Sequence, residues 1–65
     1  MEDIQQALLD LEEVNKFVGT SLIDEKLRWW IYKYKHYKGW YPRFQLNSNK
    51  FVICNRLGAR LFWGV

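Results

Sequence analysis

A lone cysteine and a lone histidine limit how this chain can be stabilised. Cys54 is the only cysteine and His36 the only histidine among 65 residues. A disulfide within the chain needs two cysteines, and a structural zinc site needs about four Cys or His ligands. Chains of this size bury only about 60% of their unfolded surface and often depend on such cross-links. This one must rely on a core of ordinary side chains, or gain stability by self-association.

Aromatic residues supply material for such a core. They make up 18% of the chain, and each buried ring removes roughly 150–250 Å² from water. For most of these rings we therefore expect a place in the interior of one small domain, residues 1–65.

Two segments in the first half have helical patterns. Over residues 3–18, apolar side chains recur at spacings of three and four, which predicts an amphipathic helix. A second helix is predicted over residues 21–38, because acidic side chains begin it and lysines end it. Aromatic residues after 28 also alternate as in a strand. The alternative is therefore one helix followed by a four-stranded β-meander.

The remainder of the chain is predicted to form strands. Pro42 ends any helix. Residues 43–47 and 50–55 flank an Asn-Ser-Asn turn and predict a hairpin, and residues 59–65 follow a turn at Gly58 and predict a last strand. The expected fold class is α+β, with two N-terminal helices followed by a small antiparallel β-hairpin or three-stranded meander.

Charge divides the chain after residue 26. All 7 acidic residues lie in the helical part, 1–26, where only Lys16 and Lys26 oppose them. Every other lysine and arginine lies in the basic aromatic part, 27–65, which contains no acidic residue. Three explanations fit this division: an anionic partner, neutralisation of one part by the other within the fold, and head-to-tail contacts between copies.

The interleaving of cations with aromatic rings suits DNA or RNA. Cations contact phosphates, and exposed rings stack on unpaired bases. No known DNA- or RNA-binding motif is present, so we expect binding without strong sequence preference. The alternative is a purely structural role, in which the aromatic rings are buried in the core and the lysines are exposed to solvent without binding a partner. The predicted nucleic-acid-binding residues are Arg28, Trp29, Tyr32, Lys33, Lys35, His36, Lys38, Arg43, Lys50, Arg56 and Arg60.

The apolar stripe of the first helix has two interpretations. It can pack on the rest of the domain, or it can form the seam of a homodimer. Two heptads are too few for a stable coiled coil, so a dimer would need other contacts as well. The seam residues would be Ile4, Ala7, Leu11, Val14 and Val18.

A role in protein–protein interaction explains the same composition. Trp, Tyr and Arg dominate interface hot spots. The basic part could dock on an acidic patch of a host enzyme, or the acidic first helix could occupy the basic groove of a DNA-binding protein. The second hypothesis is therefore an interaction or inhibitor protein, of the compact kind that phages and mobile elements encode.

Catalysis has little support in the sequence. The carboxylates end at Glu25, and a helix would carry Asp24 roughly 18 Å from His36, too far for an acid–base pair. Cys54 is expected to be a buried, inert thiol of a reducing compartment. We predict a protein without enzymatic activity, metal or cofactor. With no apolar run near the ~18 residues of a membrane span and no signal-peptide pattern, we expect it in the cytoplasm, away from membranes.

Overall fold

The computed structural model describes residues 2–35 and 39–61. Its elements are α1 (Glu2–Asn15), α2 (Ile23–Tyr34), β1 (Trp40–Gln45), β2 (Lys50–Asn55) and β3 (Arg60–Leu61). The predicted α+β fold is confirmed: two helices are followed by an antiparallel hairpin, and a strand of two residues extends the sheet in the order β1-β2-β3. The alternative with a single helix is wrong, because residues 23–34 are helical.

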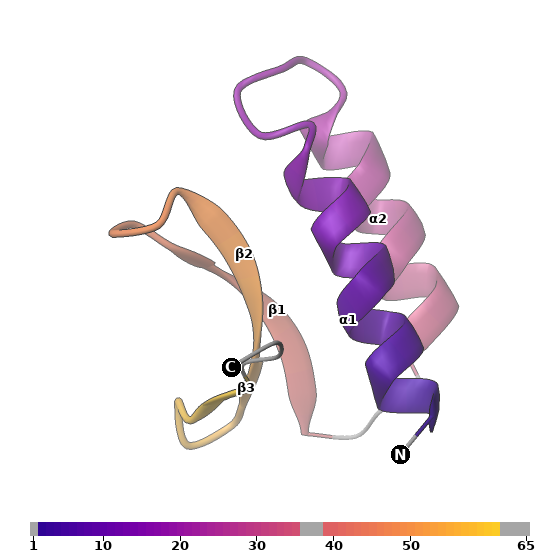
Figure 1. The fold of residues 1–65 in the computed structure, drawn as a ribbon, viewed down its shortest axis with the longest axis vertical. Helices are drawn as coiled ribbons and strands as arrows, with labels where there is room; N and C mark the ends of the chain where they lie inside the picture. The colour runs from indigo at the N-terminus through magenta and orange to yellow at the C-terminus, as the bar shows by residue number, and fades with distance from the viewer. Residues whose placement is uncertain (1, 36–38, 62–65) are drawn as a thin grey trace.

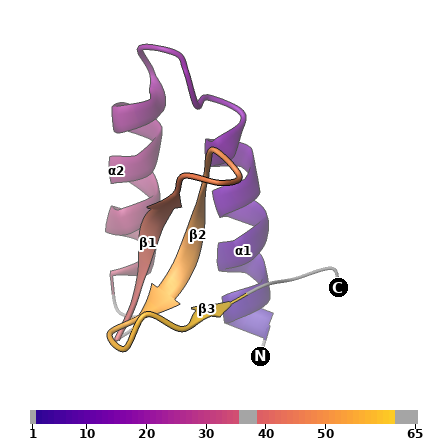
Figure 2. The ribbon, with the colours of Figure 1, turned by 90° about the vertical axis from the view of Figure 1, so that its left-hand side faces the viewer.

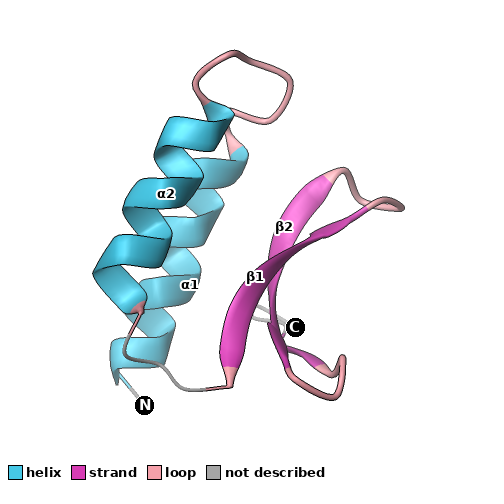
Figure 3. Ribbon diagram, turned by 180° about the vertical axis from the view of Figure 1, so that it is seen from behind, coloured by secondary structure: helices cyan, strands magenta, loops and turns pink. Residues whose placement is uncertain are grey.

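The helices form one layer and the sheet a second. Figure 1 shows α1 and α2 side by side, with the hairpin packed along them. Seen from the sheet side, β1 and β2 lie in front of the helix pair (Figure 2). Figure 3 shows the two layers from behind, with the tip of the hairpin bending away from the helices. One face of the sheet therefore covers the helices, and the other face points outward.

The core lies where α1 meets α2 and β2. Its buried members are Ala7, Leu8, Leu11, Val14, Trp30, Tyr34 and Ile53, and Ile23, Leu27, Trp40 and Phe51 pack against them. The indole N–H of buried Trp30 donates to the backbone oxygen of Ala7 at 2.8 Å, so this large ring is buried without losing a hydrogen bond.

The apolar stripe of α1 packs against the rest of the domain. Ala7, Leu11 and Val14 are buried in this core, while Ile4 and Val18 are half-buried. This is the packing that the first interpretation of the stripe expects. A homodimer through these residues stays a prediction, and it would have to compete with contacts that the chain already makes.

The helices are shorter than their patterns predict. α1 ends at Asn15 instead of residue 18, because the next residues form tight turns in which Phe17 N–H donates to Val14 O at 2.9 Å. Gly19 then adopts a φ of 89°, a conformation that suits glycine. α2 begins at Ile23 and ends at Tyr34. The last three residues of the predicted helix, 36–38, lie outside the described residues.

The strands also differ from prediction at their ends. β1 begins at Trp40, three residues early, and Pro42 lies within it opposite Ile53. Proline is tolerated there because β1 is at the edge of the sheet, where a missing N–H costs little. β3 covers Arg60–Leu61, and residues 62–65 of the predicted last strand lie outside the described residues.

Asn15 joins the two layers. Its amide nitrogen donates to the backbone oxygen of Phe51 at 2.9 Å, and its amide oxygen accepts from the backbone N–H of Phe51 at 2.6 Å. Within the described residues, β3 pairs with Ile53 and Cys54 of β2. The Asn15 side chain thus connects the end of α1 to the backbone of β2 by two hydrogen bonds.

We expect Asn15→Ala to lower the free energy of unfolding by about 1–3 kcal/mol, because it leaves two partly buried backbone groups without their partner. Urea denaturation followed by circular dichroism measures this loss. Gln5→Ala is a matched control on the exposed side of α1 and should change stability by less than about 0.5 kcal/mol. Equal effects of the two changes would show that Asn15 does not stabilise the contact between layers.

Candidate nucleic-acid interface

The outward side of the sheet, here called the outer face, is defined by strand register. Side chains alternate between the two faces of a strand. Ile53 packs into the core, so its neighbours Val52 and Cys54 point the other way. Pairing with β1 and β3 places the remaining members beside them. The outer face consists of Tyr41, Arg43, Gln45, Lys50, Val52, Cys54 and Arg60.

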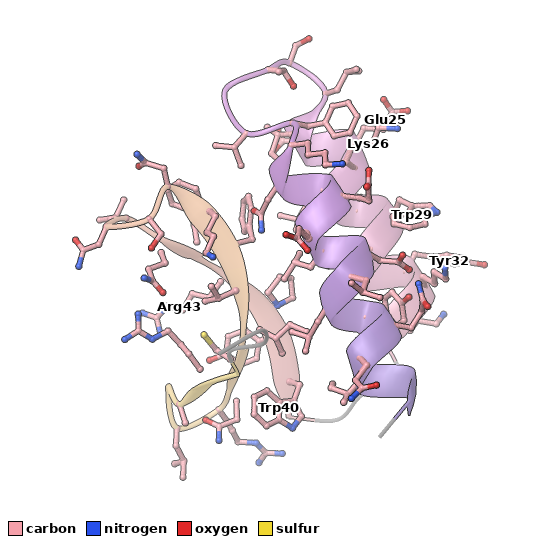
Figure 4. The ribbon with its side chains drawn as sticks, in the orientation of Figure 1. Glu25, Lys26, Trp29, Tyr32, Trp40 and Arg43 are labelled. Atoms are coloured by element: carbon pink, nitrogen blue, oxygen red, sulfur yellow. The ribbon has the colours of Figure 1, made fainter. Side chains whose placement is uncertain are left out.

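This face is basic. Arg43, Lys50 and Arg60 belong to it, and no acidic residue follows Glu25 in the sequence, so no strand contributes a carboxylate. Figure 4 shows Arg43 on the side of the sheet that points away from the helices. Tyr41 adds an exposed ring. The face thus offers cations for phosphates and one aromatic surface.

A pocket of about 380 Å³ opens on the outer face. Buried Val52 and Cys54 contribute to its lining, and Arg43, Gln45 and Arg60 provide polar groups around them. The guanidinium of Arg60 donates to the side-chain oxygen of Gln45 at 2.6 Å. The amide of Gln45 in turn donates to Ser48 Oγ at 2.9 Å. These bonds hold Arg60 across the sheet and give the pocket a fixed basic wall.

The predicted binding residues do not form a single surface. Arg43, Lys50 and Arg60 lie on the outer face, and Arg56 lies in the turn after β2. The residues on or just after α2 are Arg28, Trp29, Tyr32, Lys33 and Lys35. Figure 4 shows Trp29 and Tyr32 on the opposite side of the molecule from Arg43. The two remaining predicted residues, His36 and Lys38, lie outside the described residues.

The surface of α2 has a mixed charge. Lys33 Nζ lies 3.0 Å from Asp10 Oδ2 of α1, so part of its charge is neutralised within the fold. Asp24 and Glu25 occupy the first turn of the same helix. Lys33 and Lys35 also lie over aromatic rings, at 5.1 Å from the ring centres of Trp29 and Tyr32. Phosphates would therefore be attracted less to α2 than to the outer face.

Asp10 is held by three side chains at the contact between the helices. Tyr34 Oη and Lys33 Nζ both donate to Asp10 Oδ2, and Gln6 donates to Oδ1 at 3.1 Å. Burial raises the pKa of Asp10, but the hydrogen bonds from Tyr34, Lys33 and Gln6 outweigh it, so the pKa falls below 3.8. The ionised carboxylate is thus the form that the fold stabilises.

This shift predicts how stability depends on pH. A lowered folded-state pKa contributes stability above the unfolded value of 3.8, and that contribution is lost as pH falls through the folded pKa. We expect Asp10→Asn to destabilise the protein at neutral pH and to have a shrinking effect below pH 3.8. Urea midpoints measured across this range test it. Tyr34→Phe should weaken the same pH dependence, and an effect of Asp10→Asn that is constant with pH would contradict the account.

Four members of the outer face were not among the predicted site residues: Tyr41, Gln45, Val52 and Cys54. Tyr41 and Gln45 share it with Arg43 because they are two positions away along β1. The sequence does contain this two-residue alternation. This alternation identifies the residues of the outer face only once β1 is known to begin at Trp40, before Pro42.

Other kinds of site find little support in the described part of the chain. Within residues 2–35 and 39–61, no group of three or more His, Cys, Asp or Glu side chains could hold a metal ion. Cys54 is buried and free of any disulfide. Neither helix of this part is long and apolar enough to cross a membrane.

Comparisons of the chain with protein-family models, curated proteins and solved structures found no match.

Proposed function

We propose that the protein binds nucleic acid through the outer face of its sheet, without strong sequence preference. One observation supports this proposal: the register places Arg43, Lys50 and Arg60 on one face of the sheet, to which none of the described strands contributes a carboxylate. Lys50, at the end of β2, also lines a pocket with Glu12 of α1, so Arg43 and Arg60 are the cations farthest from the acidic part. Several cations on one surface are what a phosphate backbone requires. Of the binding residues predicted from the sequence, those on the sheet would contact nucleic acid directly, and those on α2 would not.

The side chains of the outer face favour single-stranded over double-stranded nucleic acid. Phosphate contacts hold the backbone, and the exposed ring of Tyr41 can stack on one unpaired base, a contact worth roughly 1–3 kcal/mol. The guanidinium of Arg60 carries five N–H donors, so it can contact a phosphate while it donates to Gln45. In a duplex the bases are already stacked, so Tyr41 would add nothing there.

The salt dependence of affinity tests this proposal. Fluorescence anisotropy with a labelled single-stranded oligonucleotide measures the dissociation constant at increasing salt. Three phosphate contacts predict a slope of about −2 for log affinity against log salt, at ~0.7 per contact. A duplex of the same length should bind more weakly. Absence of binding at low salt, or affinity that does not change with salt, would contradict the proposal.

A protein partner is the second candidate function. Trp29, Ile31 and Tyr32 are all exposed on α2, and large rings of this kind anchor protein interfaces. Trp29 and Tyr32 lie on the other side of the molecule from Arg43 (Figure 4), so both functions can coexist. A pull-down from cell extract with and without nuclease separates them, because partners held by nucleic acid are lost after digestion.

A further inference from the structure

A leucine and an arginine project together from the turn between β2 and β3. Leu57 is 93% exposed, and its neighbour Arg56 is exposed as well. We call these two residues the knob. The side-chain oxygen of Asn55 accepts hydrogen bonds from the backbone N–H groups of Leu57 at 3.0 Å and Ala59 at 2.9 Å. These bonds hold the backbone of the turn in one shape, from which the knob projects.

A pocket with matching chemistry lies between the two helices. It has a volume of about 380 Å³, and we call it the helix pocket. Val14, Phe17 and Trp29 supply apolar surface. Two carboxylates and one ammonium also line it: Glu13, Glu25 and Lys26. Its lining therefore suits an apolar side chain that has a positive charge beside it.

The charged groups of the helix pocket are partly engaged. Lys26 Nζ lies 4.8 Å from the ring centre of Phe17, so a cation of the chain itself already lies over this ring. Glu13 accepts a hydrogen bond from Lys16 at 2.9 Å. Glu25, which is exposed on α2, is the carboxylate best placed to meet an incoming guanidinium.

The knob and the helix pocket lie on opposite sides of the molecule. Glu25, Lys26 and Trp29 are on the helix side in Figure 4, whereas the turn between β2 and β3 is at the far end of the sheet in Figure 1. A chain therefore cannot place its own knob in its own pocket. A contact between the two must join different surfaces of two copies, which makes it heterologous.

We infer that a second copy of this chain docks its knob in the helix pocket of the first. Leu57 leaves water against Val14 and Trp29, and Arg56 meets Glu25. Because every copy carries one knob and one pocket, the contact extends head to tail. It involves a single turn, so the interface is small, and association is weak and depends on concentration.

Sedimentation velocity from about 10 μM to about 1 mM tests this contact, because small interfaces form only at high concentration. The sedimentation coefficient of the wild type should rise with concentration. Leu57→Asp replaces the apolar side chain of the knob by a carboxylate that faces Glu25, and Glu25→Arg repels Arg56, so each should remain monomeric. Leu46→Asp makes the same change at a leucine that is 78% exposed in the other turn, and it should associate like the wild type. Circular dichroism confirms that each variant is folded.

Mixing the two monomeric variants gives the sharpest result. Leu57→Asp keeps an intact pocket and Glu25→Arg keeps an intact knob, so an equimolar mixture should form a one-to-one dimer that cannot extend further. A wild type that stays monomeric at the highest concentration would overturn the inference and point to a different protein as the occupant of the pocket. A mixture that stays monomeric while the wild type associates, or a Leu46→Asp variant that fails to associate, would overturn it equally.

Discussion

Replacing Arg43 and Arg60 together by glutamate is expected to weaken binding to a single-stranded oligonucleotide by about 100-fold or more, because like charges facing each other cost several kcal/mol. Both residues belong to the outer face and line its pocket. The change removes two phosphate contacts and turns a basic surface into one that repels phosphates. Fluorescence anisotropy at low salt measures the loss, and circular dichroism confirms that the variant is folded.

A matched control separates this face from net charge. Arg28→Glu with Lys35→Glu changes the charge of the protein by the same amount on the opposite layer. Its effect on affinity should be small at physiological salt, because exposed charges more than about 8 Å away are largely screened. An equal loss of affinity in both double variants would show that overall charge, and not the outer face, controls binding. A loss confined to the α2 variant would move the binding site to that helix.

Replacing Leu11 by alanine is expected to cost about 2–5 kcal/mol of unfolding free energy, a large part of the 5–15 kcal/mol typical of small proteins. Leu11 is 0% exposed and lies in the core between the helices and β2. A chain with a single cysteine has no intrachain disulfide to compensate. We therefore expect Leu11→Ala to be largely unfolded at room temperature or to melt at a much lower temperature.

Leu9→Ala is the control for this substitution. Leu9 lies on the same helix and is 53% exposed, so the identical change should shift the urea midpoint only slightly. Similar midpoints for the two variants would show that Leu11 is not part of the core. Such a result would favour the seam of a homodimer as the main role of the α1 stripe.

Local patterns predicted the elements of this fold well. The three- and four-residue spacing of α1 indicated which side is buried, and Ala7, Leu11 and Val14 are in the core. For α2, charged residues at both ends favoured a helix over a strand, and Asp24 and Glu25 indeed lie in its first turn. These signals act within one or two turns of chain, so they can be read without knowing the tertiary structure.

Boundaries and faces depend on contacts that are distant in sequence. α1 ends at Asn15, whose side chain binds the backbone of Phe51. Pro42 can lie in β1 because that strand is at the edge of the sheet. Lys33 carries a charge that Asp10 of the other helix partly neutralises. None of these partners is adjacent in sequence, so the sequence predicted one basic surface where the fold has an outer sheet face and a mixed surface on α2.

The most direct test of the proposed function is an NMR titration of the isotope-labelled protein with a short single-stranded oligonucleotide. We predict that chemical shifts change for the side chains and amides of Tyr41, Arg43, Gln45 and Arg60, and that the changes disappear at high salt. Shifts in α2 around Trp29 and Tyr32 should stay constant. Changes confined to α2, or no changes at low salt, would contradict the assignment of nucleic-acid binding to the outer face.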